Sequence, residues 1–176
     1  MESIVFGGGC FWCIEAVFKR LKGVASFESG YTGGNIKNPS YREVCSGLTG
    51  HNEVVRVVFD ESQISLEELM SVFFTVHDPT TLNRQGNDVG TQYRSGIYYV
   101  DESQKRRAED FVRNEAVKYW SDPIVTEIEE LDVFYPAEDY HQDYYDRNSQ
   151  QGYCMMVINP KLQKLREKFK HLIKDE

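Results

Sequence analysis

The chain is 176 residues long, 40% of them hydrophobic, and carries a formal net charge of −8 at pH 7. A chain of this length can bury one good core, so we expect a single domain over residues 1–176. The acidic balance argues against nucleic acid as a partner, because a phosphate backbone requires clustered lysine and arginine that outweigh the acidic residues.

The N-terminal residues argue against export and against insertion into a membrane. They include no basic segment, and the apolar run at 4–6 is too short for a signal peptide or a membrane span. We expect a cytoplasmic protein without a membrane partner, and a monomer. In such a chain, four cysteines indicate catalytic or redox thiols rather than a structural disulfide framework.

In chain order, the first predicted element is a strand at 4–7. A helix follows that begins at Cys10 or Trp12 and ends near Leu21, because apolar residues recur there at helical spacing and Gly23 provides a stop. Residues 24–31 predict a second strand. The long polar segment from there to residue 50 is expected to be functional or mobile.

The middle of the chain predicts a central strand and a capped helix. Residues 52–59 are rich in β-branched types, which is typical of a central strand. Ser65, followed three residues later by Glu68, predicts a helix N-terminus, and the helix runs through Val76. The next expected segments are an irregular stretch at 78–94, a strand at 95–100, a helix at 101–119 and an edge strand at 124–131.

This element order predicts an α+β fold. The first six elements run β-α-β-β-α-β, which is the split βαβ or ferredoxin-like arrangement, a two-layer sandwich with two helices on one face of an antiparallel sheet. We expect the core to span about 1–135. An extension at about 136–176 adds one amphipathic helix, wraps over the core and carries Cys154.

The first candidate for chemistry is the segment at 7–15, which reads Gly-Gly-Gly-Cys-Phe-Trp-Cys-Ile-Glu. The glycines allow a tight turn that places Cys10 at or just before a helix N-terminus. Unpaired amide groups and the helix dipole favour an anion there, so we expect an exposed thiol that ionises readily and acts as a nucleophile. The alternative is a tight turn that carries two buried cysteines.

Four segments, in this order along the chain, resemble the A class of peptide methionine sulfoxide reductases. They are Gly9-Cys10-Phe11-Trp12, Gly30-Tyr31-Thr32-Gly33-Gly34, residues 39–47 with Gly50-His51-Asn52-Glu53, and residues 84–95. The resemblance runs from Ile4 to about Leu165. It implies a ferredoxin-like core, reduction of the S epimer of methionine sulfoxide, free or in oxidised proteins, thioredoxin as the reductant, and no metal or organic cofactor.

The resemblance assigns roles that the chemistry of the residues supports. A sulfoxide oxygen leaves badly, so attack by a thiolate requires a proton donor and hydrogen bonds to that oxygen. Glu53 is the expected general acid, because burial at the start of a strand should raise its pKa; the alternative is a surface glutamate. Tyr41 and Tyr93 are the expected hydrogen-bond donors; the alternative is that both pack on loops.

Three further residues are expected to bind the substrate. Phe11 and Trp12 form an apolar wall for the S-methyl group, which selects the epimer, and the alternative for both is core packing. Asp88 matches a family aspartate that helps to hold the substrate backbone or a water. The alternative for Asp88 is a turn residue that makes a local hydrogen bond.

Attack by Cys10 leaves a sulfenic acid that a second thiol condenses to a disulfide. Cys154 matches the resolving cysteine of many family members and is the expected partner, because a tail with glycine nearby can approach Cys10. Cys13 is the alternative, since it completes a C-x-x-C motif. If Cys10 is itself inside the helix that holds Cys13, the helix has to deform before the two cysteines can pair. If Cys10 lies outside the helix, no such deformation is required. Cys45 is expected to be structural.

Two other functions stay open. A general dithiol–disulfide oxidoreductase uses only Cys10 and Cys13, and it is insensitive to Glu53→Gln. A metal-binding module recruits the same two cysteines with His77 or His141. We expect no metal, because the sequence has no second ligand pair at zinc spacing, and we interpret the histidines as packing or surface residues.

Overall fold

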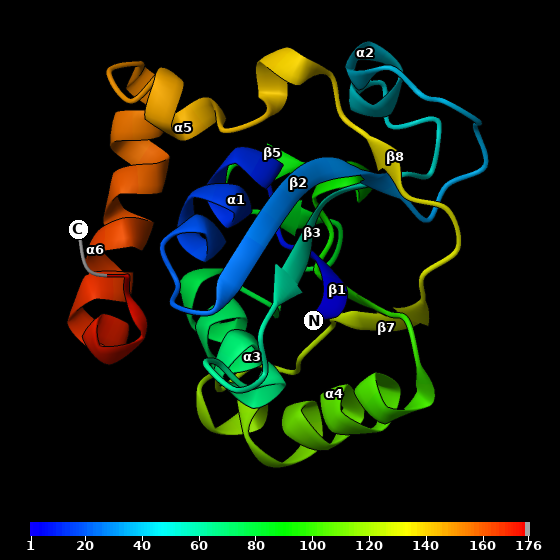
Figure 1. Ribbon diagram of the computed structural model, residues 1–176. Coiled ribbons are helices and arrows are strands. Elements are labelled where there is room, and N and C mark those ends of the chain that lie inside the picture. The colour runs from blue at the N-terminus through cyan, green and yellow to red at the C-terminus, as the bar shows by residue number, and fades with distance from the viewer. Residues whose placement is uncertain (175–176) are drawn as a thin grey trace.

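The fold is built on a mixed β-sheet with its main helices on one face, an α+β architecture (Figure 1). The computed structural model describes residues 1–174. Within them, six strands form the sheet in the order β7-β6-β1-β3-β2-β8. The strands are β1 (Glu2–Gly7), β2 (Val24–Thr32), β3 (Asn52–Phe59), β6 (Gly96–Tyr99), β7 (Glu127–Glu130) and β8 (Tyr135–Pro136). Strand β7 is parallel to β6, and the other neighbours are antiparallel.

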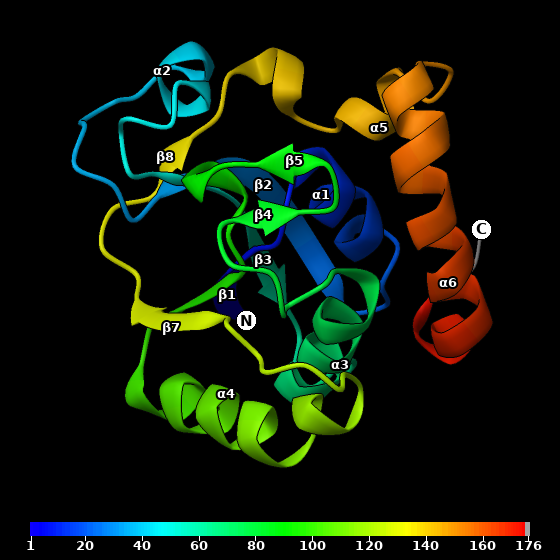
Figure 2. The same cartoon turned by 180° about the vertical axis from the view of Figure 1, so that it is seen from behind.

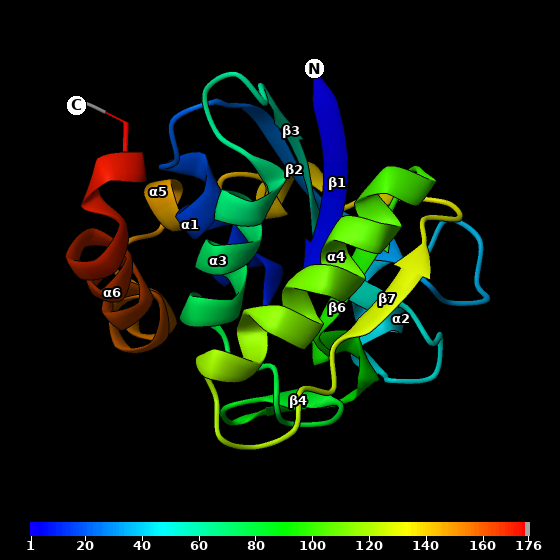
Figure 3. The same ribbon diagram turned by 90° about the horizontal axis from the view of Figure 1, so that it is seen from below.

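The helices enclose the larger core against one face of this sheet. They are α1 (Phe11–Lys19), α2 (Tyr41–Cys45), α3 (Leu66–Val76), α4 (Glu102–Asn114), α5 (Tyr144–Arg147) and α6 (Asn159–Phe169). Figure 3 shows α1 and α3 on the same side of the central strands, with α6 outside them. Side chains of β1 alternate between the faces, so Phe6 packs in this core whereas Val5 joins a smaller cluster with Val54 and Tyr98.

Local sequence signals account for several element boundaries. Ser65 accepts a hydrogen bond from the backbone of Glu68, and the Glu68 side chain accepts one from the backbone of Ser65, so the predicted capping box is present. Strand β3 occupies the predicted residues. Gly23 follows α1 with a φ of +83°, and a Cβ there would lie 2.7 Å from Ile64, so the predicted stop requires glycine.

The segments predicted to be irregular contain short elements of their own. Helix α2 lies in the polar segment before residue 50, where Ser40 and Glu43 form a second capping box. Strands β4 (Arg84–Gln85) and β5 (Asp88–Val89) pair as a hairpin within 78–94, which Figure 2 shows beside α1. Periodicity in the sequence does not reveal these elements, because a five-residue helix and two-residue strands are too short for a helix or strand pattern to repeat.

Two predicted elements are shorter than expected. The helix predicted at 101–119 ends at Asn114 and is followed by a single 3-10 turn at Ala116–Lys118. The edge strand predicted at 124–131 pairs only over β7, because the backbone of Val125 donates its hydrogen bond to Pro79 in a loop instead of to β6. Strand β7 does lie at the edge of the sheet.

The C-terminal segment returns along the side of the core. Strand β8 pairs with β2, α5 packs on α1, and α6 packs on both α1 and α3. Leu162 and Leu165 of α6 are part of the larger core cluster. The extension thereby brings its residues to the N-terminal half of the chain.

Candidate active site

Cys10 sits at the junction between β1 and α1. It is the N-cap of α1, with an extended backbone (φ −61°, ψ 131°), so it lies outside the helix. The preceding Gly9 has a φ of +92°, and a Cβ there would lie 2.7 Å from Gln85 of β4. The Gly9 amide donates to the Tyr93 carbonyl at 3.2 Å. The turn therefore places the thiol of Cys10 next to the hairpin β4–β5 and the segment that follows it.

The expectation of an exposed, readily ionised Cys10 thiol is wrong. Cys10 is only 7% exposed. Its burial raises the pKa of the thiol well above the usual value, and the neighbouring Cys13 and Glu53 raise it further. The backbone amide of Trp12 at the helix N-terminus lowers the pKa, but this effect is smaller than that of burial.

Glu53 is the buried carboxyl group of the site. It lies on β3, is 1% exposed, and its Oε1 accepts a hydrogen bond from the Phe11 amide at 3.2 Å. Its Oε2 is buried and has no hydrogen-bond partner among residues 1–174. Burial, assisted by the charges of Asp88 and Cys13, raises the pKa of Glu53 to about 8, which confirms the predicted direction. Burial therefore favours the protonated form of Glu53 at neutral pH.

The pKa values of the Tyr41 and Tyr93 hydroxyls are both shifted by the surroundings at this site. Burial raises the pKa of both hydroxyls, and the charges of Glu53 and Cys10 contribute to both shifts. Both phenols thus stay protonated and can donate hydrogen bonds. Tyr41 begins α2, and its ring lies 4.2 Å, centroid to centroid, from that of His141.

Phe11 and Trp12 belong to an aromatic cluster. Phe11 is fully buried, and its ring stacks with that of Tyr41 at a centroid distance of 6.3 Å. Trp12 stacks on Tyr144 at 3.7 Å, and its Nε1 donates to Nδ1 of His141 at 3.1 Å. Core packing therefore describes Phe11, whereas Trp12 packs against the C-terminal extension.

A hollow of about 510 Å³, which we call the cysteine pocket, opens beside Cys10. Its wall includes Cys10, Cys13, Asp88, Tyr153 and Lys161. The Tyr153 hydroxyl donates to Oδ2 of Asp88 at 2.9 Å and lies 3.6 Å from the Cys13 sulfur. Asp88 therefore does not act as a local turn residue; its partner lies 65 positions along the chain.

The four cysteines are all free thiols, and they occupy different surroundings. Cys13 lines the cysteine pocket, and a hydrogen bond from Cys10 lowers its pKa, with assistance from Lys161 and Tyr153. Cys154 is fully buried in the larger core and is not among the residues that line this pocket. Cys45 ends α2, where burial raises the pKa of its thiol.

Sequence reasoning missed residues that hold the site together. His141 accepts a hydrogen bond from the indole of Trp12. Glu138 accepts hydrogen bonds from the Tyr31 hydroxyl at 2.9 Å and from the Tyr41 amide at 3.0 Å. Glu15 accepts bonds from the Ser29 hydroxyl and the Asp143 amide. Each of these carboxylates and rings connects segments far apart in sequence, so no local pattern could have identified them.

Residues 1–174 contain neither a cluster of metal ligands nor a helix suited to a membrane. Residues 1–174 hold no group of three or more His, Cys, Asp and Glu side chains arranged to bind a metal ion. In the same residues, His77 bonds to Ser95 and to the Phe73 carbonyl, not to a cysteine. Each helix in this part of the chain is too short or too polar to span a bilayer.

The sequence is similar to those of known proteins over nearly its whole length. A sequence profile described as peptide methionine sulfoxide reductase matches residues 2–173. The chain belongs to this family. It is 55% identical over 176 residues to the peptide methionine sulfoxide reductase MsrA of Acinetobacter baumannii (strain SDF), and the match covers 100% of both chains. The reductase is thus an oxidoreductase of the MsrA type, as the four sequence segments predicted.

Solved structures of other proteins share this fold. Mxr1 from Saccharomyces cerevisiae in reduced form is 37% identical, with a TM-score of 0.82, and the match covers 87% of this reductase and 88% of Mxr1. Mxr1 in complex with Trx2 is 26% identical, with a TM-score of 0.58, over 81% of this chain and 84% of that one. These likenesses agree with the α+β fold described above.

Proposed function

We propose that this reductase converts the S epimer of methionine sulfoxide, free or in oxidised proteins, to methionine by thiol chemistry at Cys10. One observation carries the proposal: the buried carboxyl group of Glu53 accepts a hydrogen bond from the amide of the residue that follows Cys10, and its burial raises its pKa to about 8. A sulfoxide requires both a sulfur nucleophile and a proton donor, and this arrangement supplies both at one helix N-terminus.

The proposed first step transfers the substrate oxygen to Cys10. Sulfur of Cys10 attacks the sulfoxide sulfur while Glu53 protonates the oxygen, and the proton of the thiol replaces the one that Glu53 gives up. The substrate S–O bond and the transient bond between the two sulfurs then break as the protonated oxygen passes to the Cys10 sulfur. The products are methionine and a Cys10 sulfenic acid, so the substrate gains two electrons and Cys10 loses two. Tyr41 and Tyr93 donate hydrogen bonds to the oxygen, because their raised pKa keeps both hydroxyls protonated.

Binding also favours one orientation of the substrate. Trp12 is proposed to provide aromatic surface for the S-methyl group. Phe11, the other residue expected there, is fully buried and packs beside Trp12 in the core, so it supports this surface from behind. Asp88, which the Tyr153 hydroxyl holds in place, is proposed to bind the substrate backbone or a water. The epimer with methyl and oxygen exchanged would place its oxygen against apolar rings, where it has no donor.

The second step closes a disulfide with loss of water, and the contacts support Cys13 as the attacking thiol. Cys13 shares the cysteine pocket with Cys10, and its lowered pKa favours the thiolate. Cys10 lies outside α1, so the helix does not have to deform to pair the two. Cys154, the partner expected from the resemblance, stays the alternative; its route requires the π-helical turn Cys154–Ile158 to open, because Cys154 is fully buried.

The proposed reductant of this disulfide is a thioredoxin. Support comes from yeast Mxr1, whose structure was solved in complex with Trx2. We further propose that the core at about 1–135 and the extension at about 136–176 form one catalytic domain that acts as a monomer in the cytoplasm, a compartment that keeps the four free thiols reduced. The order β6-β1-β3-β2 with α1 and α3 on one face supports the ferredoxin-like description of the core.

The experiment that tests the proposal is a single turnover without reductant. The reduced enzyme is mixed with excess methionine-S-sulfoxide, methionine is quantified, and the disulfide is located by peptide mass spectrometry. We expect one methionine per enzyme and a Cys10–Cys13 disulfide; a Cys10–Cys154 disulfide would reassign the second step. Turnover by Cys10→Ser, or equal turnover of the R epimer, would contradict the proposed chemistry.

A further inference from the structure

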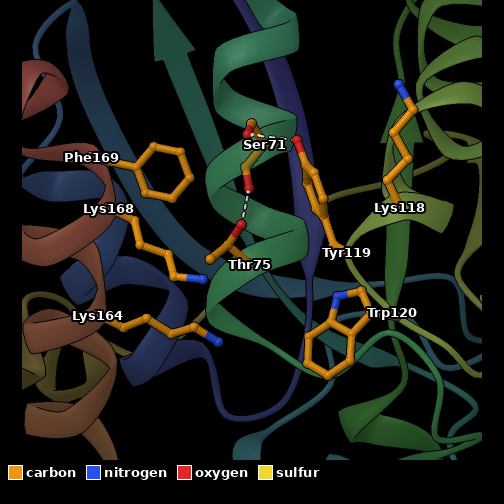
Figure 4. A pocket seen from close by; sticks show the side chains of 8 residues that line it. All are labelled: Ser71, Thr75, Lys118, Tyr119, Trp120, Lys164, Lys168 and Phe169. Atoms are coloured by element: carbon orange, nitrogen blue, oxygen red, sulfur yellow. Dashed lines mark hydrogen bonds between the residues drawn. The ribbon is translucent and has the colours of Figure 1, made fainter.

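A second hollow, of about 550 Å³, lies between α6, α3 and the turn after α4 (Figure 4). Lys164 and Lys168 reach from α6 toward α3, and Trp120 stands across from them. Tyr119 and Thr75 also line this hollow, which we call the lysine pocket. It shares no lining residue with the cysteine pocket, so the reduction step leaves it without a role.

The lysine pocket concentrates positive charge in an acidic chain. Among residues 1–174, neither Lys164 nor Lys168 takes part in an ion pair, whereas Lys118 at the rim pairs with Glu115 and points away from the other two lysines in Figure 4. The net charge of the whole chain is −8. Two ammonium groups directed into one hollow repel each other, and a bound anion would relieve that repulsion.

The neighbouring wall of the pocket is aromatic and fixed in position. Nε1 of Trp120 donates to the Phe74 carbonyl at 2.7 Å, and the Tyr119 hydroxyl is hydrogen bonded to that of Ser71 at 3.0 Å. The Lys164 ammonium lies 5.7 Å from the centre of the Trp120 ring. A fixed indole beside two ammonium groups can contact a flat ring while the charges bind an anion.

We propose that the lysine pocket binds a small phosphate-bearing ligand, with its phosphate groups between Lys164 and Lys168. A ring on the ligand, as in a nucleotide, would pack against Trp120. Lysine binds phosphate as a compact point charge, and the volume of the pocket falls within the range of about 300–1,000 Å³ typical of small-molecule sites.

The test is an NMR titration of the full chain. The protein has two tryptophans, so its spectrum contains two indole N–H signals, and Trp120→Phe assigns them. Pyrophosphate and ADP are added at about 150 mM salt, where weak surface attraction is screened. We expect a saturable shift of the Trp120 signal with both probes and no shift of the Trp12 signal. Adenosine, which lacks phosphate, should not saturate the site.

Matched charge variants decide whether the binding is specific. Lys164→Gln together with Lys168→Gln should weaken binding by about tenfold or more, which is about 1.4 kcal/mol. Lys22→Gln with Lys37→Gln removes the same charge from exposed lysines elsewhere and should leave affinity unchanged. Unaltered sulfoxide turnover in both variants verifies folding. Absence of saturation by either probe, or equal weakening by the two pairs, would overturn the proposal.

Discussion

Replacement of Glu53 by glutamine separates the catalytic role of this residue from its cost to stability. Glutamine keeps an oxygen that can accept the bond from the Phe11 amide, but it cannot transfer a proton. With a pKa of about 8, the Glu53 carboxyl is about 90% protonated at pH 7. General acid catalysis contributes about 10²- to 10⁴-fold to a rate, so we expect Glu53→Gln to lower kcat by at least about 100-fold.

The same substitution should increase stability at neutral pH. A carboxyl whose pKa is raised on folding destabilises the folded state increasingly as pH rises from the unfolded value, 4.5, to the folded value, about 8. At 1.36 kcal/mol per pH unit, this penalty reaches about 3 kcal/mol at pH 7 and is close to zero at pH 4. Glu53→Gln removes the penalty, so it should raise the free energy of unfolding by that amount at pH 7 and hardly at all at pH 4.

Two assays test this reasoning together. Single-turnover rates between pH 6 and pH 10 should fall above about pH 8 in the wild type, as Glu53 loses its proton, and should lose this decline in Glu53→Gln. Urea unfolding at pH 4 and pH 7 measures the stability change. Glu109→Gln, at an exposed position on α4, is the matched control. Equal turnover in Glu53→Gln, or a loss of stability at pH 7, would refute the reasoning.

The remaining predictions concern the second thiol, a phenol donor and the aromatic cluster. Cys13→Ser should keep the first turnover and lose thioredoxin-dependent recycling, whereas Cys154→Ser should keep both; the reverse result identifies Cys154 as the resolving thiol. Tyr93→Phe should reduce kcat/KM by about tenfold, the value of one lost hydrogen bond of about 1.4 kcal/mol, without a change in melting temperature. Trp12→Phe leaves Nδ1 of His141 unpaired and should lower the free energy of unfolding, measured by thermal unfolding, by about 1–2 kcal/mol. An unchanged Tm would contradict a stabilising role for that hydrogen bond.

The sequence alone was sufficient wherever a signal is contained in a few neighbouring residues. The capping box at Ser65, the apolar strand β3 and the glycine turn before α1 all depend on short-range geometry, and the structure has each of them. The direction of the Glu53 pKa shift could also be predicted, because a residue at the start of a strand expected to be central is expected to be buried, and burial disfavours the charged carboxylate. The four family segments, which occur in order along the chain, predicted the reaction that the protein catalyses.

Tertiary structure decided everything that depends on segments far apart in the chain. The helix N-terminus alone favours an ionised Cys10, but burial and the nearby Glu53 reverse that preference. Which second thiol shares a pocket with Cys10 is decided by the packing of the extension, which buries Cys154 and brings Tyr153 to Cys13. Burial and electrostatic energy are sums over spatial neighbours, and most of those neighbours lie too far away in sequence for any local pattern to reveal them.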